Sequence, residues 1–250
     1  MASRAHRHKS TRGWRVATAD YLRLSKSPGY GFLSVVPLLV VYEFLSLGRA
    51  HSHRSVVWYL AEELLRNGLR STGGVSVLLL NALIIAAFVL VGVLGIRWSG
   101  HKLRPLYLPV MFVEGGVLAI LLALALNAVP PLMVGAPEGV FNVTNKLATA
   151  IGAGVYEELV FRVFLLGGLV VLFTRGRRFP PWAAYVLALV VSSIAFAVAH
   201  YFSIGRAPFD RHVFLLRQMA GVVFGIIYCL RGFGVAAYAH TLYDLFVLFG

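Results

Sequence analysis

Three short groups of polar residues stand out because they lie within strongly apolar stretches of the sequence. They are Glu157-Glu158 with Arg162, Phe196 with His200, and His240 with Asp244. An ionisable side chain in the hydrocarbon core of a bilayer costs about 2.5 to more than 10 kcal/mol unless it is paired or lines a wet cavity. Function is therefore expected to reside in these groups.

The first group combines an ion pair with a second carboxylate. On a helix, Glu158 and Arg162 are four residues apart on one face, and the acid precedes the base, which favours pairing. Glu157 is rotated by about 100° from Glu158 and cannot share this cation equally well. Glu157 is therefore predicted to point elsewhere and to act as a general base toward water. The structural alternative is a buried ion network that ties helices together.

The other two groups supply imidazoles. His200 follows Phe196 by one helical turn, and a histidine in such a position, taken alone, is more often an interfacial or core residue. His240 and Asp244 share one helix face, where the carboxylate can fix the histidine tautomer or both can ligate a metal. Glu157, His200, His240 and Asp244 are thus candidates for activating water and stabilising an oxyanion, and also candidate ligands for a divalent metal such as zinc.

The composition is that of a membrane protein. Of the 250 residues, 59% are hydrophobic and 13% are charged, and the mean hydropathy is +0.79. The long apolar runs lack the alternation of barrel strands, so they predict helices. The formal net charge of +13 comes from short basic segments between these runs. This distribution is typical of topology signals and lipid headgroup contact, so no nucleic-acid partner is expected.

The apolar runs predict an all-α, polytopic integral membrane bundle of about seven transmembrane helices, with six or eight crossings as alternatives. The predicted spans lie near residues 30–48, 74–96, 108–128, 146–173, 182–203, 213–231 and 233–249. Residues 28–250 would form a single membrane domain. Residues 56–70 have the pattern of an amphipathic helix lying in the interface.

The basic segments predict the orientation of the chain. Residues 1–27 form a basic tail that is expected to be cytoplasmic, although an Arg-rich, acid-poor start is also typical of a transit peptide. With this tail inside, the connections around Arg97 and Arg175 also fall inside, as the positive-inside rule requires. A multi-pass protein of the plasma (inner) membrane with a cytoplasmic N-terminus is therefore predicted.

Two further features concern packing and depth. Gly221 and Gly225 form a small-x-x-x-small pair that lets helices approach closely, whereas Glu114 is a lone carboxylate that could border a cavity. Along straight helices of 1.5 Å per residue, Glu157 would lie about 16 Å from the start of its span, His240 about 10 Å and His200 about 27 Å. These depths do not converge, so a boundary, a tilt or a break must differ from the simple expectation.

Taken in order, Glu157-Glu158-x-x-x-Arg162, Phe196-x-x-x-His200 and His240-x-x-x-Asp244 resemble the signature of the CAAX protease and bacteriocin-processing (CPBP) intramembrane proteases. The resemblance covers about residues 146–250, the expected protease core. It implies that Glu157 activates water with His200 as its partner, and that His240 and Asp244 hold the oxyanion. The predicted catalytic residues are Glu157, Glu158, His200, His240 and Asp244, and Arg162 and Phe196 are predicted to support them.

Two questions follow from the resemblance. Such proteases are described both as metal-dependent and as glutamate-type enzymes. An ionised Asp244 accepts hydrogen bonds and cannot donate one to an oxyanion. Asp244 is therefore protonated, orients His240 or binds a cation.

The predicted function is an intramembrane endopeptidase that cleaves a membrane-associated protein or peptide within the lipid bilayer. The resemblance suggests prenylated proteins, peptide precursors or C-terminal sorting signals as substrates. One alternative is a proton-coupled transporter in which the same groups form a relay, and another is a noncatalytic membrane scaffold.

Overall fold

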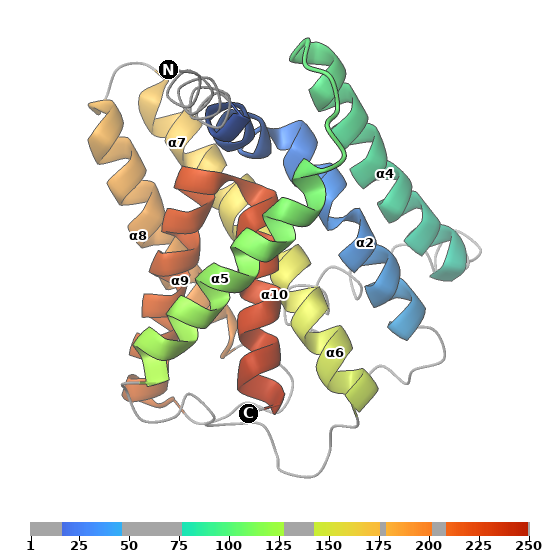
Figure 1. Ribbon diagram of the computed structural model, residues 1–250. Coiled ribbons are helices and arrows are strands. Elements are labelled where there is room, and N and C mark those ends of the chain that lie inside the picture. The colour runs from blue at the N-terminus through green and yellow to red at the C-terminus, as the bar shows by residue number, and fades with distance from the viewer. Residues whose placement is uncertain (1–16, 47–76, 128–142, 176–178, 202–208, 250) are drawn as a thin grey trace, which may run out of the picture.

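The computed structural model describes residues 17–46, 77–127, 143–175, 179–201 and 209–249 (Figure 1). Regular secondary structure in these residues is entirely helical, which confirms the predicted all-α fold. Helices lie at each predicted span: α2 (Pro28–Ser46), α4 (Val77–Trp98), α5 (Tyr107–Asn127), a segmented helix over 143–174, α8 (Pro181–Ala199), α9 (Arg211–Arg231) and α10 (Phe233–Phe249). The predicted interfacial helix at 56–70 and residues 1–16 of the basic tail lie outside the described residues.

Five of these helices, α2, α4, α5, α8 and α9, are long and apolar enough to cross a membrane. Helix α10 is apolar but has only 17 residues. It packs against α2, α5, α6, α9 and η1, and residues 233–241 are buried without a break. A helix buried on every side belongs to the interior of a bundle. Helix α10 is accordingly the central helix (Figure 1).

The fourth span is not the continuous α-helix that the sequence predicted. It consists of α6 (Val143–Gly152), the π-helical segments η1 (Ala153–Glu157) and η2 (Leu159–Leu166), and α7 (Gly167–Thr174). The span crosses the bundle obliquely, from α6 at the lower right to α7 at the upper left of Figure 1. This tilt and the wider π turns explain why depths counted along straight helices do not converge. π-Helical turns are rare in proteins, and those that occur often lie at functional sites.

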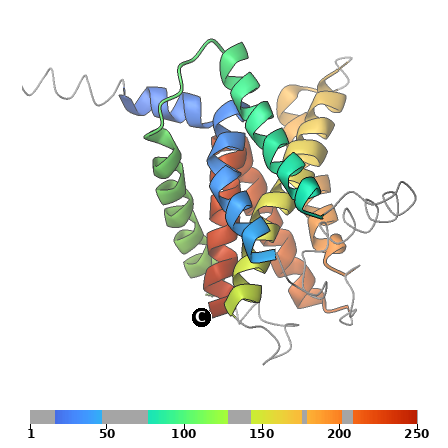
Figure 2. The same ribbon diagram turned by 90° about the vertical axis from the view of Figure 1, so that its right-hand side faces the viewer.

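A short helix over residues 17–25 lies across the end of the bundle (Figure 2). It is fixed by Arg231, whose guanidinium donates to the carbonyl oxygen of Leu22 at 3.1 Å and to Ser25 Oγ at 2.8 Å. Arg231 also forms an ion pair with Glu114, which accepts a further hydrogen bond from the Tyr21 hydroxyl. Glu114 therefore joins helices at this end of the bundle.

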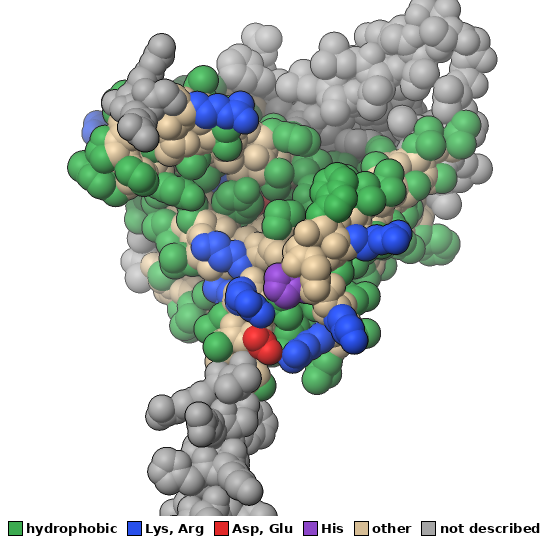
Figure 3. Space-filling model, turned by 90° about the horizontal axis from the view of Figure 1, so that it is seen from above, with side chains coloured by type: hydrophobic (Ala, Val, Ile, Leu, Met, Phe, Trp, Pro, Cys, Tyr) green, Lys and Arg blue, Asp and Glu red, His purple; other side chains and the backbone are tan. Residues whose placement is uncertain are grey.

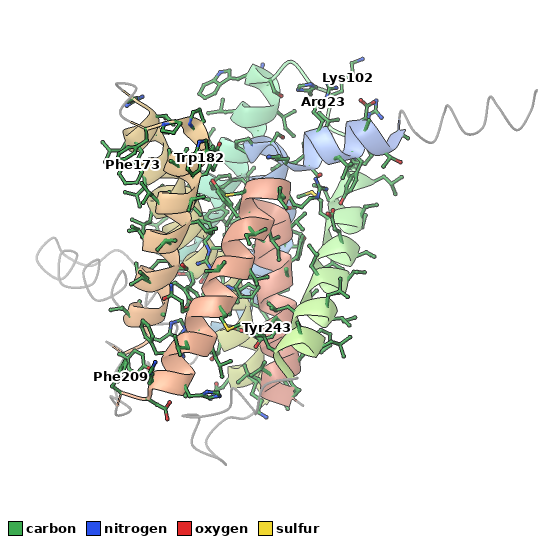
Figure 4. The ribbon with its side chains drawn as sticks, turned by 90° about the vertical axis from the view of Figure 1, so that its left-hand side faces the viewer. Arg23, Lys102, Phe173, Trp182, Phe209 and Tyr243 are labelled. Atoms are coloured by element: carbon green, nitrogen blue, oxygen red, sulfur yellow. The ribbon has the colours of Figure 1, made fainter. Side chains whose placement is uncertain are left out.

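Exposed basic side chains gather at the same end, which we call the basic face (Figure 3). They are Arg23, Lys26, Arg97, Lys102, Arg104 and Arg175. Figure 4 places Arg23 and Lys102 at this end and Phe209 at the opposite one. Segments far apart in the sequence thus present one positively charged surface.

Candidate active site

All seven residues of the three sequence motifs meet inside the bundle. Glu157, Glu158 and Arg162 come from the π-helical part of the fourth span. Phe196 and His200 come from the end of α8, and His240 and Asp244 come from α10. The predicted grouping of distant segments is therefore present, whereas the catalytic roles of these residues remain predictions.

Glu157 faces His200. The distance from Glu157 Oε2 to His200 Nε2 is 3.8 Å, and 4% of the glutamate side chain and 25% of the histidine side chain are exposed. His200 Nδ1 is 2.8 Å from the carbonyl oxygen of Phe196, which can only accept, so Nδ1 carries the proton. In the neutral ring, Nε2 is then an acceptor turned toward the carboxylate. One water molecule can donate a hydrogen bond to each of two acceptors at this separation, with its oxygen about 2.8 Å from each of them.

Glu158 has different partners from Glu157. Its Oε2 lies 3.3 Å from Arg162 Nε, and both side chains are fully buried. The predicted ion pair is therefore present. Its other oxygen, Oε1, lies 2.8 Å from His240 Nδ1. No pattern in the sequence signals this second contact, because the two residues lie on different helices and are not adjacent along the chain.

Aromatic rings enclose the buried cation. The guanidinium carbon of Arg162 lies 4.6 Å from the ring centre of Phe196 and 6.0 Å from that of Phe224. Phe196 also makes edge contacts with the rings of His200 at 4.8 Å and His240 at 5.8 Å. Phe196 therefore contacts both imidazoles and the arginine, and its supporting role in catalysis remains a prediction.

Phe224 on α9 is a supporting residue that the sequence analysis missed. Its ring stacks on His240 with a centroid distance of 4.3 Å and an interplanar angle of 17°. The preceding turn of α9 contributes the carbonyl of Gly221, which accepts a hydrogen bond from Arg162 Nη2 at 3.2 Å. Phe224 is one of many apolar residues in α9, so the sequence did not indicate that it would support His240.

Asp244 lies beyond direct hydrogen-bonding distance of His240. The distance from Asp244 Oδ2 to His240 Nε2 is 3.6 Å, and 25% of the Asp244 side chain is exposed. Since His240 Nδ1 is occupied by Glu158, the ring turns Nε2 toward Asp244 and the open part of the site. Of the three possible roles for Asp244, this geometry favours electrostatic orientation of His240.

Glycines allow the helices to approach closely enough to build the cluster. A Cβ atom on Gly154 would lie 2.0 Å from Thr241 Oγ1 and 2.8 Å from the carbonyl oxygen of Ala237, both on α10. On α9, a Cβ on Gly221 would lie 3.2 Å from the Phe196 ring, and one on Gly225 would lie 2.3 Å from Leu189. The predicted packing role of the Gly221 and Gly225 pair is confirmed.

The arrangement of side chains does not match a resident metal centre. Within the described ranges, no group of three or more His, Cys, Asp or Glu residues is placed to hold a metal ion. A catalytic zinc site needs three protein ligands around one point. The Nε2 atoms of His200 and His240 each face one carboxylate, Glu157 at 3.8 Å and Asp244 at 3.6 Å, and no third ligand of this kind converges with either pair among the described residues. We therefore derive no catalytic step through a metal.

The exposed part of the site lies away from the basic face. Glu157, Glu158 and His240 are buried, whereas His200 and Asp244 are each one-quarter exposed. His200 immediately follows the end of α8, and Asp244 lies one turn beyond His240 toward the C-terminus. Both positions lie toward the end of the bundle where α9 begins, and Figure 4 shows this end, marked by Phe209, opposite Arg23 and Lys102.

Comparison with known proteins supports a peptidase assignment. Residues 140–246 match a family model described as type II CAAX prenyl endopeptidase Rce1-like. The match confirms the family resemblance carried by the three motifs. Together with the long apolar helices it identifies an integral membrane protein. No curated protein and no solved structure gives a significant match.

Proposed function

From the Rce1-like CAAX endopeptidase domain at residues 140–246, we propose that the protein is an intramembrane endopeptidase that hydrolyses a peptide bond of a membrane-associated protein or peptide. The observation that carries this proposal is the buried Glu157 carboxylate, 3.8 Å from the partly exposed His200. A transporter relay would also use buried ionisable groups, but the family match favours hydrolysis.

In the proposed reaction, Glu157 and His200 hold one water molecule. Each accepts a proton of the water in a hydrogen bond, so a lone pair on the water oxygen points toward the substrate. Glu157 takes a proton as this oxygen attacks the scissile carbonyl carbon. When the C–N bond breaks, this proton passes to the leaving nitrogen. The products are an amine and a carboxylic acid, and the acid then gives up the second water proton, so that the products leave as a carboxylate and an ammonium group.

His240 is the proposed oxyanion donor. With protons on both nitrogens, its ring donates through Nδ1 to Glu158 and keeps the Nε2 proton for the negative oxygen that forms on the attacked carbonyl. Its position is fixed by stacking on Phe224 and by Glu158, which Arg162 holds in turn. A donor fixed before the reaction stabilises the transition state without reorganisation and is typically worth about 2.7 to 4 kcal/mol.

The basic face supports a cytoplasmic N-terminus in the plasma (inner) membrane, because Lys and Arg accumulate on the inner side. The site opens at the opposite end of the bundle, so we place its opening on the non-cytoplasmic side. A prenylated protein that stays in the cytoplasm would not reach this opening. Exported peptides and C-terminal sorting signals fit it better.

Comparative sequencing of protein termini in host membranes tests the proposed function. Cells that carry wild-type protein should contain cleaved membrane-protein termini that are absent from cells carrying Glu157→Gln at equal abundance. Asp20→Asn, which alters a partly exposed carboxylate at the basic face, is the matched control and should produce the same termini as the wild type. Identical termini in wild-type and Glu157→Gln membranes would remove the assignment.

A further inference from the structure

A half-open cavity of about 310 Å³ lies at the end of the bundle that carries the basic face. It is bounded by the start of α2, by the second half of the fourth span, and by the junction between α9 and α10. None of the seven residues of the three sequence motifs lines it. The proposed catalytic mechanism therefore gives this cavity no role.

The walls of the cavity are apolar. Val163, Leu166 and Val170 line it along the fourth span, and the rings of Phe32 and Phe233, 5.1 Å apart, line it from α2 and α10. From Val163 to Val170 the wall is about 10 Å long at 1.5 Å per residue. Ligand pockets in proteins usually measure about 300–1,000 Å³, so a cavity at the lower end of this range suits one hydrocarbon chain.

Lys26 is the exposed basic residue of the cavity lining, so it marks the open side at the basic face. The carboxylates described at this end already have cations: Asp20 lies 3.3 Å from Arg104, and Glu114 pairs with Arg231. Among the described residues, no carboxylate lies within ion-pair distance of Lys26. Its ammonium group is therefore available to an external anion.

Exposed tryptophans place this opening at the depth of lipid headgroups. Trp182, at the start of α8, is 71% exposed, and Trp98, at the end of α4, is 82% exposed. Figure 4 shows Trp182 at the same end of the bundle as Arg23 and Lys102. Tryptophan side chains are enriched at the membrane interface. The ammonium group of Lys26 thus lies at headgroup level, and the apolar walls continue from it into the hydrocarbon region.

We propose that the cavity binds one anionic phospholipid of the leaflet at the basic face, with its phosphate on Lys26 and one acyl chain along the fourth span. Charge complementarity favours this occupant, because clusters of Lys and Arg attract anionic lipids to the membrane surface. The inference goes beyond the proposed endopeptidase function, since the cavity and the site opening lie at opposite ends of the bundle.

Tyr228 supplies a polar group at intermediate depth. A Cβ atom on Gly232 would lie 2.7 Å from the carbonyl oxygen of Lys26, so these two backbones are in contact. Tyr228 lines the cavity one helical turn before Gly232, and its hydroxyl would lie 3.4 Å from a Cβ on Gly167 of the fourth span. This hydroxyl is placed to donate to an ester carbonyl of the lipid. The order of cation, hydroxyl and apolar wall matches that of phosphate, ester and acyl chain.

Thermal unfolding of the purified full-length protein in detergent micelles tests the site. Dioleoyl phosphatidylglycerol and dioleoyl phosphatidylcholine have the same chains and differ in net charge. At saturation the anionic lipid should raise the melting temperature of the wild type by about 5 °C or more, and the neutral lipid clearly less. Lys26→Gln should respond equally to both lipids, whereas Lys26→Arg should keep the wild-type preference. Inorganic phosphate, which has no acyl chain, should give no shift.

Matched variants separate this cavity from the rest of the surface. Arg23→Gln removes an exposed arginine of the basic face that does not line the cavity, and it should keep the preference. Val170→Phe should fill the cavity and abolish the response to both lipids, whereas Leu172→Phe, at an exposed position of the same helix, should keep it. Melting without lipid shows whether each variant is folded. The Lys26 variants change only an exposed side chain, so they decide the question even if the larger ring impairs folding.

Four results would overturn the lipid site. They are equal stabilisation of the wild type by the two lipids, an unchanged preference in Lys26→Gln, an undiminished response in folded Val170→Phe, and a shift with phosphate alone. None of them bears on peptide cleavage, so the proposed function would remain intact.

Discussion

Each of the two adjacent glutamates has its own histidine. Glu157 faces His200 near the exposed end of the site, whereas Glu158 binds His240 and Arg162 in the interior. The Glu158 carboxylate is neutralised by Arg162, whereas the Glu157 carboxylate faces the partly exposed His200. In the proposed mechanism, Glu157 is the reactive group and Glu158 holds the oxyanion donor His240 in place.

Replacing Glu158 should affect stability as strongly as turnover. Glu158→Gln leaves the buried Arg162 without its counter-charge, which typically costs about 3 to 5 kcal/mol. Thermal unfolding in detergent should therefore show a clear loss for Glu158→Gln and a smaller one for Glu157→Gln. The double variant Glu158→Gln/Arg162→Met should recover stability but not activity. Equal melting temperatures for wild type and Glu158→Gln would contradict the assigned role of the ion pair.

At this scale the sequence predicts pairs within one helix better than contacts between helices. The Glu158 and Arg162 pair follows from helical periodicity, because spacing of four residues places both on one face. The stacking of Phe224 on His240 and the hydrogen bond from Arg162 to the Gly221 carbonyl depend on how the fourth span, α9 and α10 cross. Periodicity within a single helix contains no information about these crossings.

At the scale of elements, the fourth span decides the geometry of the site. Its π-helical turns carry Glu157 and Arg162, and Ser192 of α8 donates to the carbonyl oxygen of Phe161 in η2 at 2.6 Å. A hydrogen-bond donor on a neighbouring helix can support backbone carbonyls that depart from α-helical pairing. The apolar run predicts a helix here, but a π-helical turn depends on such neighbours, so the sequence alone did not predict it.

Close contact between η1 and α10 should be essential for activity. Gly154→Ala would place a methyl group 2.0 Å from Thr241 Oγ1 and close to the α10 backbone, which must force the helices apart at a cost of about 1 to 3 kcal/mol. The separation of Glu158 from His240 should increase and peptide cleavage should fall at least about tenfold. Gly168→Ala in the same span meets no atom within 4 Å and is the matched control. Similar activities for the two variants would show that this contact does not position the site.

At the scale of the whole molecule, the basic face and the exposed part of the site lie at opposite ends of the bundle. The basic face closes one end with the 17–25 helix, and the site opens at the other. Hydropathy was sufficient to predict the helices and their approximate bounds, because about 20 apolar residues are needed to cross a bilayer. It could not predict which end holds the site, since that depends on helix tilt and on where α8 ends.

Cysteine labelling tests the orientation. In a Cys229→Ser background, His212→Cys places a thiol on an exposed residue at the start of α9, and Lys102→Cys places one on the basic face. A membrane-impermeant maleimide should label His212→Cys in intact cells (spheroplasts if an outer membrane is present) and should label Lys102→Cys only after the membrane is opened. The reverse pattern would place the site opening on the cytoplasmic side and would restore cytoplasmic prenylated proteins as substrates.

The most direct test of water activation by Glu157 is peptide cleavage by the purified protein in water enriched in oxygen-18. With a library of N-palmitoylated decapeptides as substrate, wild-type protein should incorporate one heavy oxygen into each new carboxylate. The cleavage rate should fall by at least about 100-fold in Glu157→Gln and in His200→Ala, although both variants should remain folded. His212→Ala should keep wild-type turnover. If Glu157→Gln cleaved peptides at the wild-type rate, Glu157 would not be the catalytic base and the proposed mechanism would fail.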